Sequence, residues 1–243
     1  MLKDRLILLN EHTKVAIQHS EKAAVKYTVN QLLDSYKKAV ESHGFFALAV
    51  SGGSTPKPVY EYLVHHAEEI DWSKVKLFFV DERAVSADSP DSNYKRVMDT
   101  GFSKLTISQI NRMKAESNIE ENANAYEELL TKELNDGKLD CILLGMGTDG
   151  HTASLFPDTE GLKIENKCVI ANYIPSKKAW RMTLSFPQIC SSKKILFLVM
   201  GKPKAQIVKN VVVEHKPLPA YMVCQKSSSP IYWILDTLAG RLI

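Results

Sequence analysis

Short apolar runs alternate along this chain with longer segments in which apolar residues recur at helical spacing. An uninterrupted apolar run is typical of a strand buried on both faces of a parallel sheet. Apolar residues three or four positions apart indicate one face of a helix. The alternation therefore predicts an α/β fold with a mainly parallel sheet and helices on both faces. Predicted strands cover residues 45–50, 75–80, 139–144, 167–172, 195–200, 220–224 and 231–235, and predicted helices cover 25–40, 59–70, 123–134 and 203–213.

The composition favours a single domain over residues 1–243, because a chain of this length with 44% hydrophobic residues can bury one full core. The 31 basic and 28 acidic residues give a net charge of +3, which is too balanced for a nucleic-acid-binding protein. No apolar stretch approaches the roughly 18 residues of a membrane span, and the N-terminus lacks a signal-peptide pattern. The four cysteines lack C-x-x-C spacing. We expect a cytoplasmic protein with free thiols, present as a monomer or weak dimer.

The segment Gly145-Met-Gly-Thr-Asp-Gly-His-Thr-Ala-Ser-Leu-Phe-Pro157 carries the most informative chemistry of the chain. It follows the predicted strand at 139–144, so Asp149 and His151 are expected at the carboxyl edge of the sheet. That edge is where open α/β sheets bind ligands, and a histidine there can exchange a proton near neutral pH. We therefore predict a reaction site that contains His151 and Asp149.

Gly145, Gly147 and Gly150 also satisfy the G-x-G-x-x-G pattern of dinucleotide-binding proteins. That pattern requires a long helix after the glycines and an acidic residue about 20 positions further on. Pro157 interrupts any helix here within two turns. The favoured interpretation is a tight turn that approaches a ligand closely, without a nucleotide cofactor.

A second glycine-containing turn, Ser51-Gly-Gly-Ser-Thr-Pro56, follows the predicted strand at 45–50. Thr55 is a candidate N-cap and Pro56 a candidate first residue of the next helix. Outward-facing N–H groups and the positive end of that helix would favour a phosphate. A tight turn without a ligand is the alternative. The candidate phosphate ligands are Gly52, Gly53, Ser54 and Thr55.

Charged residues lie at or near the ends of other predicted strands. Asp81-Glu-Arg83 closes the strand at 75–80, with Ser92-Asn93 in the loop beyond. Charged groups so close to a core must pair with each other or meet a polar ligand, so an internal Arg–carboxylate pair is the alternative to a binding site. Arg181 and Lys204 are candidate ligands or surface cations. The remaining histidines show no partner pattern, and no metal site is expected.

Taken together, these segments resemble the 6-phosphogluconolactonase family. The resemblance rests, in chain order, on residues 51–56, 81–85 with 92–93, 145–157, 181–184 and 201–205. It implies a modified Rossmann-like sheet of the glucosamine-6-phosphate isomerase superfamily. It also implies hydrolysis of 6-phospho-D-glucono-1,5-lactone to 6-phosphogluconate in the oxidative pentose phosphate pathway. The loop at 86–90 departs from the family in lacking the Pro and His that often follow the arginine motif.

The resemblance implies that a small phosphorylated sugar lactone binds with its phosphate on residues 52–55, Arg181 and Lys204. Arg83 is then available to the lactone end and Asp81 to the sugar hydroxyls. His151 is the candidate general base, and Asp149 either orients its ring or caps a short helix at 151–156. No metal or organic cofactor is expected, because an ester is already activated.

Two other functions stay open. Glucosamine-6-phosphate deaminases resemble this chain in the Asp-Gly-His motif but continue with Asn-Glu-Pro, whose glutamate works with the histidine in ring opening. Here residues 155–157 are Leu-Phe-Pro and the next acid is Asp158, which favours the lactonase. The second alternative is a sugar-phosphate-binding protein without catalysis, against which the presence of His151 beside Asp149 argues.

Overall fold

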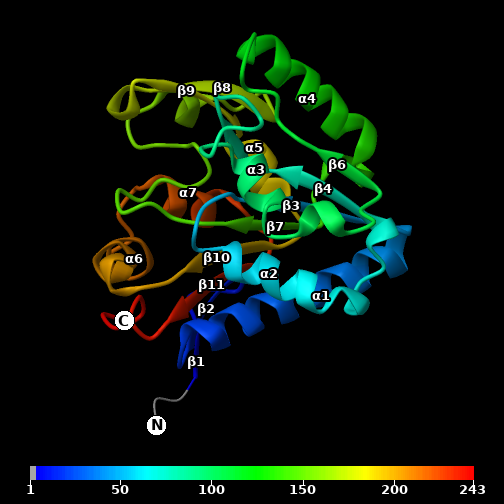
Figure 1. The fold of residues 1–243 in the computed structure, drawn as a ribbon. Coiled ribbons are helices and arrows are strands. Elements are labelled where there is room, and N and C mark those ends of the chain that lie inside the picture. The colour runs from blue at the N-terminus through cyan, green and yellow to red at the C-terminus, as the bar shows by residue number, and fades with distance from the viewer. Residues whose placement is uncertain (1–3) are drawn as a thin grey trace.

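The computed structural model describes residues 4–243 and contains two sheets (Figure 1). The strands of the larger sheet are β1 (Arg5–Leu8), β2 (Thr13–Gln18), β3 (Phe46–Val50), β4 (Val75–Phe79), β6 (Gln109–Asn111), β7 (Cys141–Leu144), β10 (Ile195–Val199) and β11 (Ile231–Asp236). Their order across the sheet is β1-β2-β11-β10-β7-β3-β4-β6. Every neighbouring pair is parallel except β1 and β2. The predicted mainly parallel sheet is therefore confirmed.

A second, antiparallel sheet stands at the carboxyl edge of the first. It consists of β5 (Asp81–Arg83), β9 (Ala179–Leu184) and β8 (Val169–Ile174), in that order. Val80 joins the two sheets, because its N–H donates to the Val50 carbonyl (3.0 Å) and its carbonyl accepts from the Leu184 N–H (2.8 Å). The chain thus leaves β4 and enters the small sheet directly, which carries Asp81 and Arg83 over the edge of the large one.

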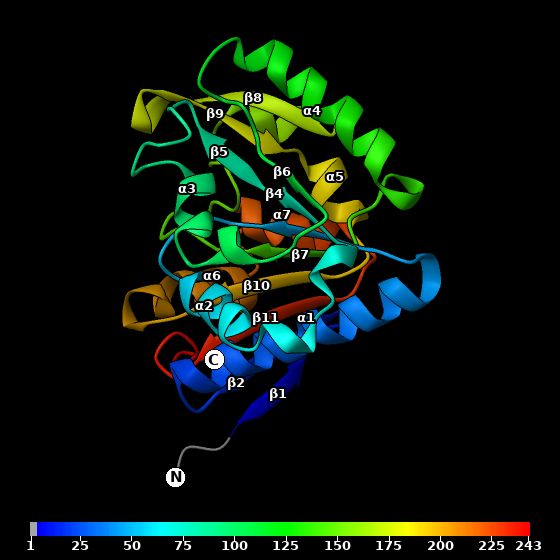
Figure 2. The same ribbon diagram turned by 45° about the vertical axis from the view of Figure 1, so that its right-hand side comes forward.

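The helices lie on both faces of the large sheet, as the alternating pattern predicts. α1 connects β2 to β3 in one direction across the sheet, whereas α6 and α7 connect β10 to β11 in the opposite direction. Right-handed crossovers that run in opposite directions place their helices on opposite faces, and Figure 2 shows α1 and α7 on the two sides of the strands. The helices are α1 (Glu21–His43), α2 (Lys57–His65), α3 (Asn93–Met98), α4 (Ile119–Glu133), α5 (Phe186–Ser191), α6 (Ala205–Val212) and α7 (Pro219–Lys226).

The core is centred on the middle strands. All residues of β3, β7 and β10 are buried, as expected for strands covered on both faces. Trp233 on β11 stacks on Phe197 of β10 with 4.1 Å between ring centroids. Within residues 4–243, none of the helices is both long enough and apolar enough to cross a bilayer.

The predicted strand at 220–224 is wrong, because these residues belong to the helix α7. Pro219 is the first residue of this helix, a position that proline favours since it has no N–H to leave unpaired. A short apolar run cannot by itself distinguish a buried strand from a buried helix. The sequence also did not predict β1, β2, β5, β6 and β9, of which β5 and β6 have only three residues each.

Candidate active site

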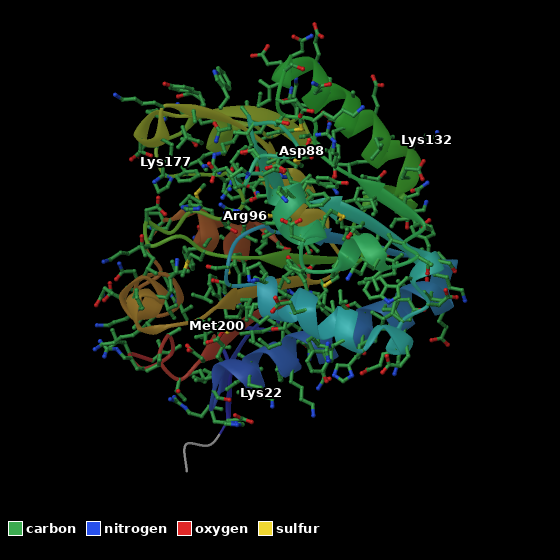
Figure 3. All side chains as sticks on the ribbon, viewed as in Figure 1. Lys22, Asp88, Arg96, Lys132, Lys177 and Met200 are labelled. Carbon is green, nitrogen blue, oxygen red and sulfur yellow. The ribbon has the colours of Figure 1, made fainter. Side chains whose placement is uncertain are left out.

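A cavity of about 220 Å³ opens at the carboxyl edge of the large sheet, beside β3 and β7. The connection after β3 runs toward β4, whereas the chain after β7 runs toward β10 on the other side. This reversal of strand order creates the crevice in which open α/β sheets bind ligands. In Figure 3, Met200 marks the carboxyl end of β10 and Asp88 marks the loop that follows β5. The lining residues include Gly52, Gly53, Ser54, Thr55, Asp81, Arg83, His151 and Arg181.

Larger hollows exist in the described part of the chain. One of about 670 Å³ lies between helices α1 and α2, and none of the residues predicted to act on a substrate lines it. A hollow of about 590 Å³ lies between the turn after β1 and helix α7, and its lining includes Glu11, His12 and His215. None of the residues predicted to act on a substrate lines it. The smaller cavity combines an imidazole, a carboxylate and two guanidinium groups, so we assign the candidate site by its chemistry.

His151 and Asp149 form a close pair at the cavity. His151 Nδ1 lies 2.6 Å from Asp149 Oδ1, which also accepts the backbone N–H of His151 at 3.2 Å. An ionised carboxylate only accepts hydrogen bonds, so Nδ1 carries the proton and Nε2 is the basic nitrogen. The imidazole stacks on Phe156 with 3.9 Å between ring centroids and an angle of 15°. The ring is therefore held on one face and at one nitrogen.

On the pKa of each member of the pair, burial and the partner act in opposite directions. Burial lowers the pKa of His151 below its ordinary value, although the charge and hydrogen bond of Asp149 act in the other direction. Burial acts to raise the pKa of Asp149, but the charge of His151 and its hydrogen bonds outweigh this and lower the pKa. His151 is thus a neutral base at neutral pH, next to an ionised carboxylate.

Glycine at position 147 makes room for this pair. A Cβ on Gly147 would lie 2.1 Å from His151 Nδ1 and 2.4 Å from Asp149 Oδ1. Residues 151–156 form turns and an isolated bridge between Thr152 and Leu155. The expected short helix at 151–156 is therefore wrong, and with it the role of Asp149 as its cap. The long helix that a dinucleotide-binding turn requires is also lacking among the described residues that follow Gly150, where a 3-10 helix at Glu160–Lys163 is the next helical element.

The Gly52 turn forms another wall of the cavity. Gly53 has a φ of +106°, a conformation that favours glycine. Ser51 anchors the turn, because its Oγ donates to the Leu143 carbonyl (2.9 Å) and its carbonyl accepts from Tyr60 Oη (2.6 Å). α2 begins just beyond, so its positive end faces the turn. Thr55 is not the N-cap of α2, because Pro56 occupies that position and no side chain caps the helix.

Two arginines from the small sheet point to an anionic ligand. Arg83 on β5 lies directly opposite Arg181 on β9, and both line the cavity. Within residues 4–243 neither guanidinium forms an ion pair with a carboxylate, so the internal Arg–carboxylate pair is not formed. Arg83 donates from Nη1 to the Asp91 carbonyl. Burial lowers the pKa of Arg181, and the like charge of Arg83 adds to this, against the opposing charge of Asp81.

Lys204 adjoins the cavity without lining it. Its ammonium group donates to the Met146 carbonyl at 2.6 Å, and Met146 is a lining residue. Burial lowers the pKa of Lys204, although the charge of Asp149 acts to raise it. Eight of the ten predicted site residues therefore line the cavity, and a ninth, Asp149, bonds to His151. Lys204 lies next to the cavity through its bond to Met146.

The family model described as glucosamine-6-phosphate isomerases/6-phosphogluconolactonase matches residues 19–233. The chain belongs to this family. A relative from Chlamydia pneumoniae named 6-phosphogluconolactonase is 35% identical over 238 residues, which cover 95% of this chain and 91% of the relative. One from Haemophilus influenzae with the same name is 36% identical over 203 residues, covering 81% and 87%.

Solved structures agree with this assignment. The 6-phosphogluconolactonase from Thermotoga maritima has a TM-score of 0.81 and 27% identity, covering 92% of this chain and 99% of its own. A monomeric glucosamine-6-phosphate deaminase has a TM-score of 0.78 at 23% identity, covering 94% and 99%. The latter likeness concerns the fold, which both branches of the family share.

Sequence reasoning missed several residues that shape the site. Asn93 lines the cavity, Ser154 bonds to Asp81, and Phe156 supports the imidazole. Ser154 and Phe156 belong to the His151 segment, and Asn93 follows the arginine motif, but nothing in the spacing indicated where their side chains point. For metals there is no candidate set, because no three His, Cys, Asp or Glu side chains gather suitably in the described part of the chain.

Proposed function

We propose that this protein hydrolyses 6-phospho-D-glucono-1,5-lactone to 6-phosphogluconate. The single observation that carries the proposal is the combination of two features in one cavity. A neutral histidine is held by a carboxylate, and two arginines have no carboxylate partner within the described residues. The histidine held by a carboxylate is the arrangement of a general base, and the arginines suit a phosphorylated ligand. The relatives named 6-phosphogluconolactonase support the same substrate.

In the proposed reaction, His151 Nε2 removes a proton from a water molecule as that water attacks the lactone carbonyl carbon. The tetrahedral oxyanion then collapses, and the bond between the carbonyl carbon and the ring oxygen breaks. The imidazolium returns its proton to the departing ring oxygen, and the new carboxylic acid ionises. Asp149 keeps the proton on Nδ1 and stabilises the transient imidazolium.

The substrate is proposed to span the cavity. Its phosphate lies against residues 52–55, with Arg181 and Lys204 as cationic partners. Arg83 faces the lactone end and stabilises the oxyanion, while Asp81 accepts hydrogen bonds from sugar hydroxyls. His151, which lines the same cavity, then faces the water molecule that attacks the carbonyl carbon.

The test is a direct comparison of two reactions in the same preparation. We expect rapid hydrolysis of freshly generated 6-phosphogluconolactone, with the spontaneous rate subtracted, and no release of ammonia from glucosamine 6-phosphate. The first acid after His151 is Asp158, an exposed residue beyond the turn, so the carboxylate needed for ring opening is lacking at that position. Ammonia release without lactone turnover would reverse the assignment within the family.

A further inference from the structure

Asn93 is a buried cavity residue to which the proposed reaction gives no role. It is the first residue of α3 and is 2% exposed. Its backbone N–H donates to Glu82 Oε1 (2.7 Å), and Ser92 Oγ donates to Glu82 Oε2 (2.9 Å). Glu82 thereby fixes the start of α3 against β5, and the position of Asn93 follows from it.

The Asn93 amide directs its nitrogen to Asp81. Nδ2 donates to the Asp81 carbonyl (2.9 Å) and to Asp81 Oδ1 (3.0 Å). In the reverse orientation the amide oxygen would face two acceptors, so the hydrogen-bond network determines which end is the nitrogen. The Asn93 amide nitrogen therefore makes both of its hydrogen bonds to Asp81.

Ser154 holds the other oxygen of the same carboxylate. Its Oγ donates to Asp81 Oδ2 at 2.5 Å. Ser154 is itself anchored by the small sheet, because its N–H donates to Thr183 Oγ1 (3.1 Å) and its carbonyl accepts from Asn172 Nδ2 (2.9 Å). Each carboxylate oxygen can accept two hydrogen bonds, so each keeps capacity for a donor that approaches from the cavity.

The Asn93 amide also separates Asp81 from the Gly52 turn. Its Oδ1 is buried and has no hydrogen-bond partner among residues 4–243, and a Cβ on Gly52 would lie 2.2 Å from it. The amide therefore fits closely between the carboxylate and the glycine. A change at Asn93 acts on the orientation of Asp81 and on the width of the cavity at this point.

We propose that Asn93 and Ser154 are positioning residues that orient the Asp81 carboxylate to accept hydrogen bonds from two hydroxyl groups of a cyclic sugar substrate. The assignment rests on the proposed function. The other ionisable groups that face Asp81 in the cavity are Arg83, Arg181 and His151. A site built to bind hydroxyl groups discriminates strongly against an analogue that lacks one, because its buried acceptor is then left unpaired.

The deciding variant is Asn93→Asp, which keeps the size and shape of the side chain. At high pH two adjacent carboxylates repel each other, and Asp81 keeps the Ser154 donor but loses the donor at position 93. At lower pH the pair shares one proton, and the O–H restores the lost donation. We expect the ratio of variant to wild-type kcat/KM to rise severalfold between about pH 8 and about pH 5.5. The charge of Asp81 acts to raise the pKa of His151, and a second carboxylate beside it would act in the same direction. That effect would lower the ratio at low pH, so a rise of the ratio cannot come from His151.

Two further variants and a control complete the test. Asn93→Ala and Ser154→Ala should each lower kcat/KM about 10- to 100-fold without such a pH-dependent recovery. Gln188→Ala is the matched control, because Gln188 is also 2% exposed and its Nε2 donates to the Gly137 carbonyl (3.1 Å) away from the cavity. It should lower stability and leave kcat/KM unchanged.

The positioning role is overturned if the Asn93→Asp ratio is flat with pH and Asn93→Ala loses no more kcat/KM than Gln188→Ala. If Asn93→Ala does not fold, the Asn93→Asp profile decides alone. A wild-type protein that does not hydrolyse the lactone would refute the proposed function instead. The two failures are therefore distinguishable.

Discussion

At the scale of single residues, the proposed role of His151 rests on what surrounds its ring. Asp149 accepts a hydrogen bond from Nδ1, Phe156 covers one face of the ring, and Gly147 leaves the space in which the pair lies. The motif offered this pair as one of two roles for Asp149, the other being the cap of a helix at 151–156, because two residues so close in sequence in a tight turn are neighbours. The partners of Asp81 could not be predicted in this way, since Asn93 and Ser154 are 12 and 73 positions away.

The pH dependence of the reaction is the first prediction. A general base acts in its neutral form, so kcat/KM should rise with pH through the pKa of His151, which burial lowers below the ordinary value. The enzyme should therefore keep most of its activity in mildly acidic solution. His151→Ala should remove this titration and lower kcat about 10²- to 10⁴-fold. A midpoint above the ordinary histidine pKa, or a His151→Ala variant with the same profile, would contradict this role.

Gly147→Ala tests the packing of the pair. The added methyl group would meet His151 Nδ1 and Asp149 Oδ1 and push the ring from its position. A displacement of about 1 Å costs about 100-fold in rate, so kcat should fall by that order while circular dichroism shows an intact fold. Gly145→Ala is the comparison, because its Cβ has no atom within 4 Å, and its loss should be clearly smaller. Equal losses would mean that the turn, not the pair, is sensitive.

At the scale of elements, strand ends were predictable and strand partners were not. The apolar runs at 45–50, 75–80, 139–144 and 195–200 correspond to β3, β4, β7 and β10, so their carboxyl ends meet at one edge. β5 is a strand only because β9 pairs with it, and no local pattern shows that pairing. A local pattern also could not identify the helix at 219–226, because its short apolar run fits a buried strand as well as a buried helix.

The β5–β9 pairing leads to a prediction about the phosphate. Because this pairing sets Arg181 beside Arg83 in the cavity, Arg181→Ala should weaken binding of the phosphorylated lactone by about 2–5 kcal/mol. Lys204→Ala should weaken it as well. Unphosphorylated gluconolactone should be a poor substrate and nearly indifferent to either change. KM values for both lactones provide the measurement.

Arg112→Ala serves as the control for the loss of a cation. Arg112 is paired with Glu116 at 2.6 Å and does not line the cavity. It should leave both KM values near those of the wild type. If Arg181→Ala affected both lactones equally, the guanidinium would have a structural role and the phosphate would bind elsewhere.

At the scale of the whole molecule, the cavity lies where two sheets meet. The large sheet contributes the Gly52 and His151 turns, and the small sheet contributes Asp81, Arg83 and Arg181. The sheets are joined through Val80 and by contacts such as Ser154 with Asp81. A ligand that touches both sheets adds further links between them.

This arrangement predicts that the product, 6-phosphogluconate, stabilises the folded protein. A ligand that binds only the native state at 100 times its Kd adds about 2.7 kcal/mol. For a chain of 243 residues this corresponds to a rise in Tm of about 5–10 °C. Gluconate, which lacks the phosphate, should give little shift at the same concentration, and Arg181→Ala should reduce the shift with 6-phosphogluconate. Differential scanning calorimetry measures all three. If gluconate raised Tm as much as its phosphorylated form, Arg181 and the Gly52 turn would contribute no phosphate binding and the substrate class would have to be revised.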